Sequence, residues 1–588
     1  MKKIFFLLTT LSFVIANAQD PLPIWMTEEE KSMMSTYEFS TNSLDRNGIT
    51  TPPQGNLRNM AEWEEVEYLL LTWVPTYSNT ITNIVAAAVN ECKVFIISSN
   101  PSSVENTLTN SGVALDSVII LERNYNTIWI RDYAANSVYQ NWNDDLILVD
   151  WIYNRPRPLD NSSPEAVANE LNIPLYQMTE APTDLIGTGG NWMSDGFGTG
   201  FSSMLIVDEN EPGNSFGVTG KSVADIENIF EDFMGVERYI KMDNLPYDAI
   251  DHIDMHMKLL DEETILVSEY PPGVADGPQI EANIQYVLDN YMSVYGTPYK
   301  TVKIPAPPST SGLYPDNNGY YRTYTNSVFV NNTVIVPFYR EEYDTIAQRI
   351  YEEALPGYNI VGVNVDGQNG EQLIAMGGAI HCITHSIGVQ APMILSHQAL
   401  EDTYDNDNPY EVEAYISHRS GIANATLHYR VGDSGPYQSV PMTNTSGDDW
   451  VGYIPAQNGT VDIQYYVEGE SNSGKTQVRP MPAPDGYWEF TVFDDELANL
   501  NEYGIEEKAI YPNPATSITV VPVVSAPQEK GKIELLDITG KVVEVIYEGE
   551  FPLGEKNYFF DASNYAKGSY RVNITSNKRS ESHQIVIL

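Results

Sequence analysis

The stretch HIDMHMKLLDEETILVSEY, residues 252–270, contains a polar start, a turn and a strongly apolar run. In an extended strand His252, Asp254 and His256 share one face, and the apolar residues between them share the other. The turn and apolar run that follow favour a β-hairpin. On a helix His252 and His256 would be an i, i+4 pair like that of a zinc site, but Ile253 stands where that motif has glutamate. We therefore predict a strand, and a purely structural His–Asp pair is the simpler alternative to a functional site.

Three further passages repeat this order of polar start, turn and apolar strand. They are WIRDYAANSVYQNWNDDLILVDWIY (129–153), GGNWMSDGFGTGFSSMLIVDE (189–209) and RTYTNSVFVNNTVIVPFY (322–339). The polar starts and one cysteine recur at gaps of 59, 61, 74 and 56 residues, counted through Asp132, Asn191, His252, Asn326 and Cys382. An earlier apolar strand, VEYLLLTWVP (66–75), lies about one period before the first of them.

A period of about 60 residues is typical of a repeated supersecondary unit. If the units surround an axis, their polar starts point at a common centre, and five distant segments build one site. The alternative is that hairpins are common and the spacing is accidental. Because residues capable of chemistry recur at the same point of each unit, the repeat is the favoured interpretation.

The length, charge and N-terminus of the chain limit its class. A chain of 588 residues with 42% hydrophobic residues should form several domains with real cores. The formal charge of −48 argues against nucleic acid or an anionic membrane as partner and favours cationic substrates, although it also serves solubility. Residues 1–18, MKKIFFLLTTLSFVIANA, have the pattern of a signal peptide, and no later stretch is apolar enough for a transmembrane segment. Residues 19–55 are polar and predict a pro-segment or mobile arm.

Beyond about residue 400 the hydrophobic pattern changes to a period of two. After the acidic linker EDTYDNDNPY (401–410), the segments ATLHYRV (425–431) and VDIQYYVE (461–468) alternate apolar and polar residues. This predicts a small β-sandwich over residues 408–495. A second acidic linker, around 494–501, precedes another small β-sandwich over residues 505–588.

Cys382 lies in MGGAIHCITHSIG, residues 376–388, and is a candidate nucleophile. Two glycines before it allow the backbone to approach a ligand closely, and histidine is nearby. His381 and His385 could instead bind a metal together with Cys382, although the spacing is not a familiar zinc pattern. Because export favours disulfides, a pairing with Cys92 is a further alternative.

Charged residues provide the other candidates. WIRDY places Asp132 beside Arg131 and Trp129, which alone is an ordinary ion pair. In YNRPRPLD the alternating prolines hold Arg155 and Arg157 on one side of an extended backbone. Two arginines on one face suit a carboxylate, through charge-assisted bidentate bonds. A solvated surface pair is the alternative.

The ordered set WIRD, GGNWMSDG, HIDMH, YTNS and GGAIHCITHSIG resembles the bacterial, Porphyromonas-type peptidylarginine deiminase group, which is related to agmatine deiminases. The resemblance implies a catalytic deiminase domain over residues 56–400 with an α/β fold, a pentein-like propeller of five pseudo-symmetric units. It also implies that the 408–495 sandwich is immunoglobulin-like. The last module, with YPNP, KIELLDITGKVV and its final strands, resembles the type A C-terminal sorting domain of type IX secretion.

Carried over residue by residue, the resemblance makes Cys382 the nucleophile and His252 the acid/base. Asp132 and Asp254 become the carboxylates that hold a guanidinium group, and Asn326 becomes an orienting residue. The substrate-binding residues that it implies are Trp129 and the pair Arg155 and Arg157, which would hold the carboxylate of a C-terminal arginine. The chemistry needs no metal or organic cofactor, and a structural Ca²⁺ or Na⁺ sometimes accompanies the family.

The expected reaction converts a C-terminal peptidyl-arginine to peptidyl-citrulline and ammonia through a cysteine thiouronium intermediate. Agmatine lacks a carboxylate for the arginine pair, and export points away from polyamine synthesis. Agmatine deimination to N-carbamoylputrescine and free-arginine deimination remain as alternatives. A Cys–His amidase or protease and a non-enzymatic surface adhesin are more remote ones.

The two ends of the chain predict a location and partners. A signal peptide with a type IX sorting domain implies a protein that is secreted or held at the outer-membrane surface. The expected partners are arginine-containing peptides or proteins and the type IX secretion machinery, with no nucleic acid and no transmembrane segment.

Overall fold

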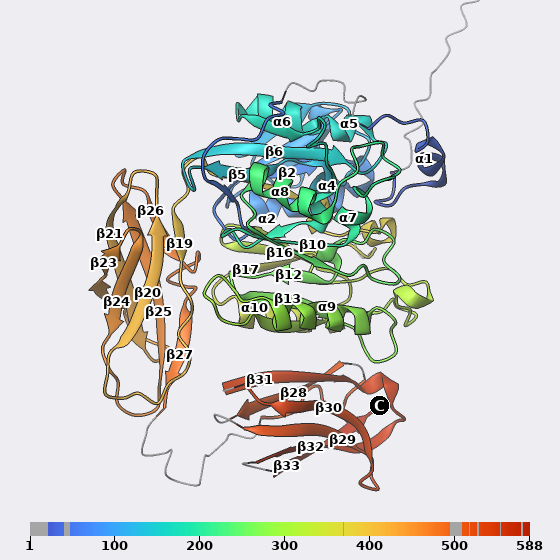
Figure 1. The fold of residues 1–588 in the computed structure, drawn as a ribbon. Helices are drawn as coiled ribbons and strands as arrows, with labels where there is room; N and C mark the ends of the chain where they lie inside the picture. The colour runs from blue at the N-terminus through green and yellow to red at the C-terminus, as the bar shows by residue number, and fades with distance from the viewer. Residues whose placement is uncertain are drawn as a thin grey trace, which may run out of the picture.

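The computed structural model describes residues 21–39, 48–367, 370–493, 508–516, 518–525, 529–552, 554–577 and 580–588. The predicted signal peptide and the acidic linker around 494–501 lie outside these residues. A mixed α/β region comes first, and a β-sandwich stands beside it (Figure 1). The C-terminal β module lies next to α9 and α10 of the α/β region (Figure 1). Within the described residues, no helix has both the length and the apolar character needed to cross a bilayer.

Four sheets of the α/β region share one pairing pattern, in which two antiparallel strands are followed by a third that runs parallel to the second. Their strands are β5 (Asn136–Gln140), β6 (Asp145–Tyr153) and β7 (Leu175–Met178); β9 (Met193–Ser194), β10 (Thr199–Ser203) and β11 (Arg238–Met242); β12 (Met257–Leu259), β13 (Thr264–Glu269) and β14 (Lys300–Pro305); β15 (Val328–Val330), β16 (Thr333–Phe338) and β17 (Asn359–Asn364). The short strands β1 (Leu57–Asn59) and β8 (Ile186–Gly187) pair with β5 and β6.

A fifth sheet joins the two ends of the α/β region. Strand β18 (His385–Gly388) pairs antiparallel with β2 (Val66–Thr72). β2 then pairs parallel with β3 (Lys93–Ser98), which pairs parallel with β4 (Val118–Glu122). The repeated hairpin-and-crossover unit predicted from the sequence is therefore present in the strand pairing. The arrangement of five such units around a common axis stays a prediction.

Each parallel pair needs a crossover, and helices supply it. The crossover helices are α2 (Ser78–Ala88), α3 (Pro101–Asn110), α6 (Ser163–Leu171), α8 (Val223–Met234), α9 (Gly277–Asn290) and α10 (Glu341–Ala354). The sequence of α8 explains its form: Ser222 and Asp225 make a capping box, and the apolar residues from Ile226 to Phe233 bury one face. Gly235 ends the helix at φ 69°, where an added Cβ would lie 2.1 Å from the carbonyl oxygen of Leu57.

Short helical turns stand immediately before the first strand of several units. They are α4 (Ile130–Tyr133), η2 (Gly189–Asn191), η3 (Ile253–Met255) and η6 (His381–Ile383). The predicted strand over His252, Asp254 and His256 is therefore wrong. Asp251 reverses the chain at φ 57°, and the backbone N–H groups of Met255 and His256 donate to the carbonyls of His252 and Ile253. This turn separates His256 from the face that His252 and Asp254 share.

The β-sandwich has two facing antiparallel sheets. One contains β19 (Ile394–Ser396), β20 (Tyr410–Ser417), β24 (Asp449–Ile454) and β23 (Thr443–Ser446); the other contains β22 (Gln438–Pro441), β21 (Ile422–Val431), β25 (Val461–Ser471), β26 (Thr476–Arg479) and β27 (Trp488–Val492). The alternation in the sequence is confirmed, since Leu427 and Val467 are buried in the shared core. The sandwich begins before the predicted residue 408 because β19 pairs with β20.

The C-terminal module is also made of two sheets. β28 (Ile518–Ser525) pairs with β31 (Gly554–Asp561), and the second sheet has the order β30 (Val542–Glu550), β29 (Lys530–Leu536), β32 (Gly568–Ser576) and β33 (Ser580–Ile587). As the alternation predicts, Val572 and Ile574 are buried. The module contacts the α/β region through Asn557, which donates to Glu353 of α10 at 3.0 Å.

Candidate active site

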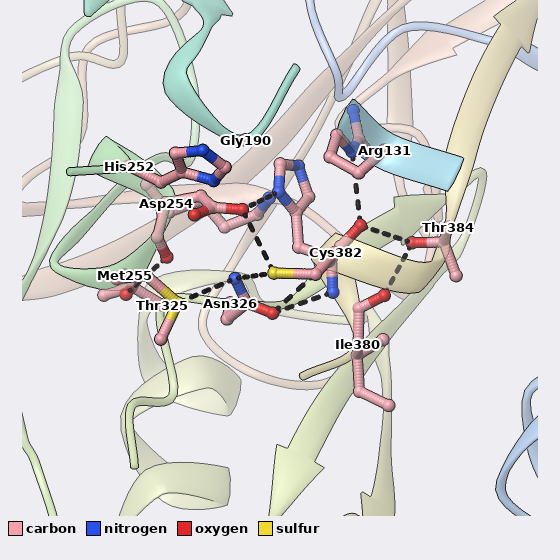
Figure 2. Close-up of polar contacts among 12 residues, drawn as sticks. Arg131, Gly190, His252, Asp254, Met255, Thr325, Asn326, Ile380, Cys382 and Thr384 are labelled. Atoms are coloured by element: carbon pink, nitrogen blue, oxygen red, sulfur yellow. Dashed lines mark hydrogen bonds and ion pairs between the residues drawn. The ribbon is translucent and has the colours of Figure 1, made fainter. Parts of the chain in front are cut away.

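Turns from different units bring five predicted residues together in one site. They are Asp132 from α4, His252 and Asp254 at η3, Asn326 before β15, and Cys382 from η6. Figure 2 labels four of them, His252, Asp254, Asn326 and Cys382. None of these side chains is more than 1% exposed. The strands that follow each turn are hydrogen-bonded on both sides or packed in the core, so each turn has a fixed position.

Cys382 has two polar neighbours. Its Sγ lies 3.7 Å from Oδ2 of Asp254, and Nδ2 of Asn326 donates to it at 3.3 Å (Figure 2). Oδ1 of Asn326 accepts from the backbone N–H of His381 at 3.0 Å, so the amide both touches the sulfur and fixes the turn that carries it. A Cβ on Gly378 would lie 3.0 Å from this sulfur and 2.6 Å from the ring of Trp129. Glycine is therefore needed there, as its place before the cysteine indicated.

Asp132 and His252 lie on the other side of the site. Oδ1 of Asp132 is 3.7 Å from Nδ1 of His252, and it accepts from the backbone N–H of Gly190 at 3.3 Å. Nε2 of His252 is 3.3 Å from Oγ1 of Thr188. A Cβ on Gly190 would lie 2.3 Å from the His252 ring. The glycine pair of η2 thus provides space for the imidazole.

The site is short of positive charge. Burial raises the pKa of the Cys382 thiol well above its usual range, the charges of Asp254 and Asp132 raise it further, and the contact with Asn326 lowers it. Burial also raises the pKa of Asp132, with a contribution from Asp254 that His252 and Arg155 oppose. Burial lowers the pKa of His252, against the effect of both carboxylates. In the described part of the chain, neither carboxylate has a lysine or arginine salt bridge, so a buried cation would complement the pair.

His381 connects the site to a second carboxylate. Its Nδ1 is 2.7 Å from Oδ2 of Asp254, and its Nε2 is 2.9 Å from Oε2 of Glu62. Lys258 lies on the far side of Glu62 at 2.8 Å. Burial alone would raise the pKa of Glu62, but the charges of Lys258 and His381 hold it well below its usual range. Each ring nitrogen of His381 thus faces a carboxylate oxygen, and the ring connects Asp254 to Glu62.

Sequence reasoning missed Glu62 and Lys258 and considered His381 only as a metal ligand. The position of His381 directly before the nucleophile candidate was the available signal, whereas Glu62 is 319 residues away from it in the chain. His385 does not join the site, since its Nε2 contacts the carbonyl of Ala135 at 2.9 Å. The alternative of a disulfide between Cys92 and Cys382 is not formed, because both cysteines are free.

The predicted substrate-binding residues contact the N-terminal segment of the chain. Trp129 Nε1 donates to the carbonyl of Leu22 at 3.0 Å, and Arg155 Nε donates to the carbonyl of Ile24 at 3.1 Å. Arg157 binds the carboxylate of Glu30 in α1 (Glu28–Met33). The alternative of a solvated arginine pair is wrong, because both side chains are buried and hydrogen-bonded.

Replacement of Asp132 by Asn should shift the titration of Cys382. Removal of a negative charge stabilises the thiolate, so the pKa of the thiol should fall and its ultraviolet absorbance should appear at lower pH. The measurement uses a Cys92→Ala background so that only Cys382 titrates. The control is Asp195→Asn. Asp195 is also a buried carboxylate, but its charge is not among those that raise the pKa of Cys382, so this variant should leave the titration unchanged. Equal shifts in both variants would refute the account.

His381→Ala should destabilise the α/β region more than His385→Ala. The first change leaves the carboxylates of Asp254 and Glu62 without the imidazole between them, at a cost of about 3–5 kcal/mol. The second removes a bond to a backbone carbonyl, worth about 0.5–1.5 kcal/mol, from a histidine that is also buried. Both variants lose the same volume, so the difference between their calorimetric unfolding midpoints reports the two carboxylate contacts of His381. Equal midpoints would show that these two contacts add nothing.

Comparisons with known proteins identify the families that the chain resembles. The family model of the Porphyromonas-type peptidyl-arginine deiminase matches residues 58–387, more than half of the chain, and that of the secretion system C-terminal sorting domain matches residues 509–588. A "Putative agmatine deiminase" of Mycoplasma mycoides subsp. mycoides SC is 21% identical over 375 residues, which cover 57% of this chain and 96% of the relative.

Two solved structures are similar to the α/β region. One of a "putative agmatine deiminase" has a TM-score of 0.50 and 21% identity, and it covers 59% of this chain and 99% of that one. One of a "Putative Arginine Deiminase" from Porphyromonas gingivalis has a TM-score of 0.49 and 20% identity, with 56% and 98% covered. The region has the mixed α/β fold of these deiminases, and the chain belongs to the Porphyromonas-type peptidyl-arginine deiminase family.

Proposed function

We propose that this deiminase hydrolyses the guanidino group of an arginine at the C-terminus of a peptide, giving peptidyl-citrulline and ammonia. Members of its family are hydrolases that act on guanidino groups. The observation that carries the proposal is the buried thiol of Cys382, 3.7 Å from the carboxylate of Asp254 and under the electrostatic influence of Asp132. Neither carboxylate has a lysine or arginine salt bridge among the described residues. A planar guanidinium cation satisfies both carboxylates through bidentate hydrogen bonds.

In the proposed mechanism the guanidinium lies between Asp132 and Asp254. The thiol of Cys382 gives its proton to His252 as the sulfur attacks the central carbon, and His252 passes that proton to the departing ammonia. The thiouronium that remains is covalently bound to the sulfur. His252 then accepts a proton from a water molecule, which attacks the same carbon, and the carbon–sulfur bond breaks to release a ureido group. No metal or organic cofactor takes part, and a structural Ca²⁺ or Na⁺ stays a prediction.

The substrate itself would activate the nucleophile. In the free site, burial and two negative charges keep the pKa of Cys382 high. A guanidinium bound to Asp132 and Asp254 places a positive charge beside the sulfur and cancels the effect of the carboxylates. The thiolate would therefore form mainly when a cationic substrate is present. This gives Asp132 and Asp254 a second role, since they keep the thiol unreactive until they are neutralised.

The arginine pair favours a peptide over agmatine. Arg157 already holds a carboxylate, with Nε 2.7 Å and Nη2 3.2 Å from the two oxygens of Glu30, so the side chain is placed to bind such a group in a bidentate manner. Agmatine has no carboxylate to use this contact. The sorting domain over residues 509–588 supports an exported enzyme, whereas a polyamine pathway is intracellular. The named agmatine deiminases among its relatives make agmatine the second candidate, and free arginine shares the carboxylate argument.

The proposal includes two finer features. The five units of paired strands would surround one axis with the turns of Asp132, Asp254 and Cys382 at its centre. The first 18 residues would act as a signal peptide, and the sorting domain would then direct the protein through type IX secretion to the medium or the outer-membrane surface.

A substrate panel tests this function. The two proteins to compare are the full chain and a variant without residues 21–34, the segment that contacts Trp129, Arg155 and Arg157. Each would be given a peptide ending in arginine, its C-terminal amide, free arginine and agmatine. The products to measure are citrulline and carbamoylputrescine. Amidation should lower kcat/KM by at least about tenfold, since one charge-assisted contact is worth roughly 1.4 kcal/mol or more. Cys382→Ala should form no product.

The same panel can contradict the proposal. Higher kcat/KM for agmatine than for the free-acid peptide would make the protein an agmatine deiminase. Cleavage of the peptide without citrulline would favour the protease alternative, and a chain without any turnover would favour the adhesin.

A further inference from the structure

The candidate nucleophile is closed off from solvent. Cys382, His252 and Asp254 each have 0% exposure, so a guanidinium group cannot reach the thiol in this structure. The N-terminal segment, residues 21–34, contacts the residues that were expected to receive the substrate. A substrate that uses Trp129, Arg155 and Arg157 must therefore displace this segment or find it already removed.

The segment is held mainly through its backbone. Nε1 of Trp129 donates to the carbonyl of Leu22, Nε of Arg155 donates to the carbonyl of Ile24, and the N–H of Ile24 donates to the carbonyl of Met376 at 2.9 Å. Backbone groups are common to all peptides. These contacts can therefore bind a peptide of varied sequence.

Arg157 makes the most contacts with the segment. Its Nη2 donates to the carbonyls of Pro23 and Trp25 at 2.7 and 3.1 Å. Its Nε and Nη2 donate to the two carboxylate oxygens of Glu30. The pair is buried, with side chains 1% and 6% exposed. Burial opposes ionisation of Glu30, but Arg157 lowers its pKa overall, so the carboxylate is charged. The segment thus presents Arg157 with the same kind of group as a peptide C-terminus.

The side chain of Ile24 packs against the loop that leads to the nucleophile. It is fully buried in the large core of the α/β region. A Cβ on Gly377 would lie 2.6 Å from Ile24 and 2.6 Å from Trp25, and the φ of 96° at Gly377 also requires glycine. This packing is possible because residue 377 has no side chain, in the loop that leads directly to Cys382.

We propose that Trp129, Arg155, Arg157 and the backbone at residues 376–377 form a binding site for a peptide with a carboxylate, and that residues 22–30, which bend at Ile24 and Trp25 and enter α1, occupy it as a built-in inhibitor. The part of this inference that concerns substrate rests on the function proposed above. Removal or displacement of residues 21–34 opens the path to Cys382. The ligand class is a peptide backbone with a carboxylate, which matches an arginine-terminated peptide.

A tethered inhibitor has a characteristic kinetic effect. A short tether gives the segment an effective concentration in the millimolar range, against which a free peptide must compete. The segment should therefore raise KM and leave kcat nearly unchanged, because saturating substrate displaces it. A segment that only stabilises the fold would instead lower activity and stability when it is removed.

The test measures access to Cys382 directly. Iodoacetamide alkylation would be followed at each cysteine by peptide mass analysis, with Cys92 of the same chain as internal reference. The variants are a deletion of residues 21–34, Ile24→Asp and Glu30→Gln. The matched control is Glu29→Gln, which makes the same charge change at an exposed neighbouring residue of α1.

The deletion and Ile24→Asp should alkylate Cys382 at least about tenfold faster, and Glu30→Gln should do so to a smaller extent. Glu29→Gln and the rate at Cys92 should not change. A synthetic peptide of residues 21–34, added to the deletion variant, should slow alkylation again, whereas the same peptide with Ile24→Asp should not. Unchanged alkylation of Cys382 in the deletion and in Glu30→Gln would overturn the proposal.

Two further outcomes are distinguishable. If the deletion unfolds the protein, Cys92 also becomes reactive, and the near-isosteric Glu30→Gln then decides. If alkylation accelerates and the added peptide reverses it, but no citrulline forms from any substrate, the peptide site stands and the proposed deiminase function fails. If citrulline forms with the same KM in the full chain and the deletion, the function stands and the inhibitor is refuted.

Discussion

The carboxylate of Asp254 is the contact on which the site depends. Its Oδ2 accepts from Nδ1 of His381 at 2.7 Å and lies 3.7 Å from the sulfur of Cys382. His381 and Cys382 are consecutive, so one buried carboxylate fixes the distance between two turns that are 128 residues apart in the chain. A buried carboxylate is tolerated only with a partner, and Glu62 in turn holds that partner in place. Positioning of the thiol and restraint of its ionisation thus come from the same interaction.

The repeated unit makes such an arrangement possible. Each polar turn leads into a buried strand, and the hydrogen bonds of that strand to its neighbours fix where the turn ends. Side chains on one-turn helices have little freedom when the following strand cannot slide. The large apolar core around these strands includes Ile253, Met255 and Ile383, which flank Asp254 and Cys382 in sequence. Polar residues therefore face the centre because their apolar neighbours are buried on the other side.

The sequence predicted the hairpins and the converging residues better than the local backbone. Period-two alternation was sufficient for β12 and β13, and the spacing of the polar starts indicated that His252, Asn326 and Cys382 would meet. The roles of Asp132 and Asp254 as a carboxylate pair came from the family resemblance. The one-turn helix at Ile253–Met255 was not predictable, because three residues carry no periodic signal and its hydrogen bonds depend on the turn at Asp251. Glu62 was not predictable either, since its role arises only from contact with His381 across the fold. The sequence indicated the arginine pair, but it did not indicate that the N-terminal segment binds to it.

The N-terminal segment matters because Arg155 and Arg157 bind its carbonyl and carboxylate oxygens. If these arginines bind both the segment and a substrate, a substitution at either arginine weakens both contacts. The relative affinity for the segment and the substrate then changes little. Lysine could not replace them, since it lacks the planar fork that holds Glu30 and two backbone carbonyls at once. Control of the site must therefore act on the segment, through Ile24 and Glu30 or through cleavage beyond them. Those residues can vary without cost to the substrate contacts, whereas the arginines cannot.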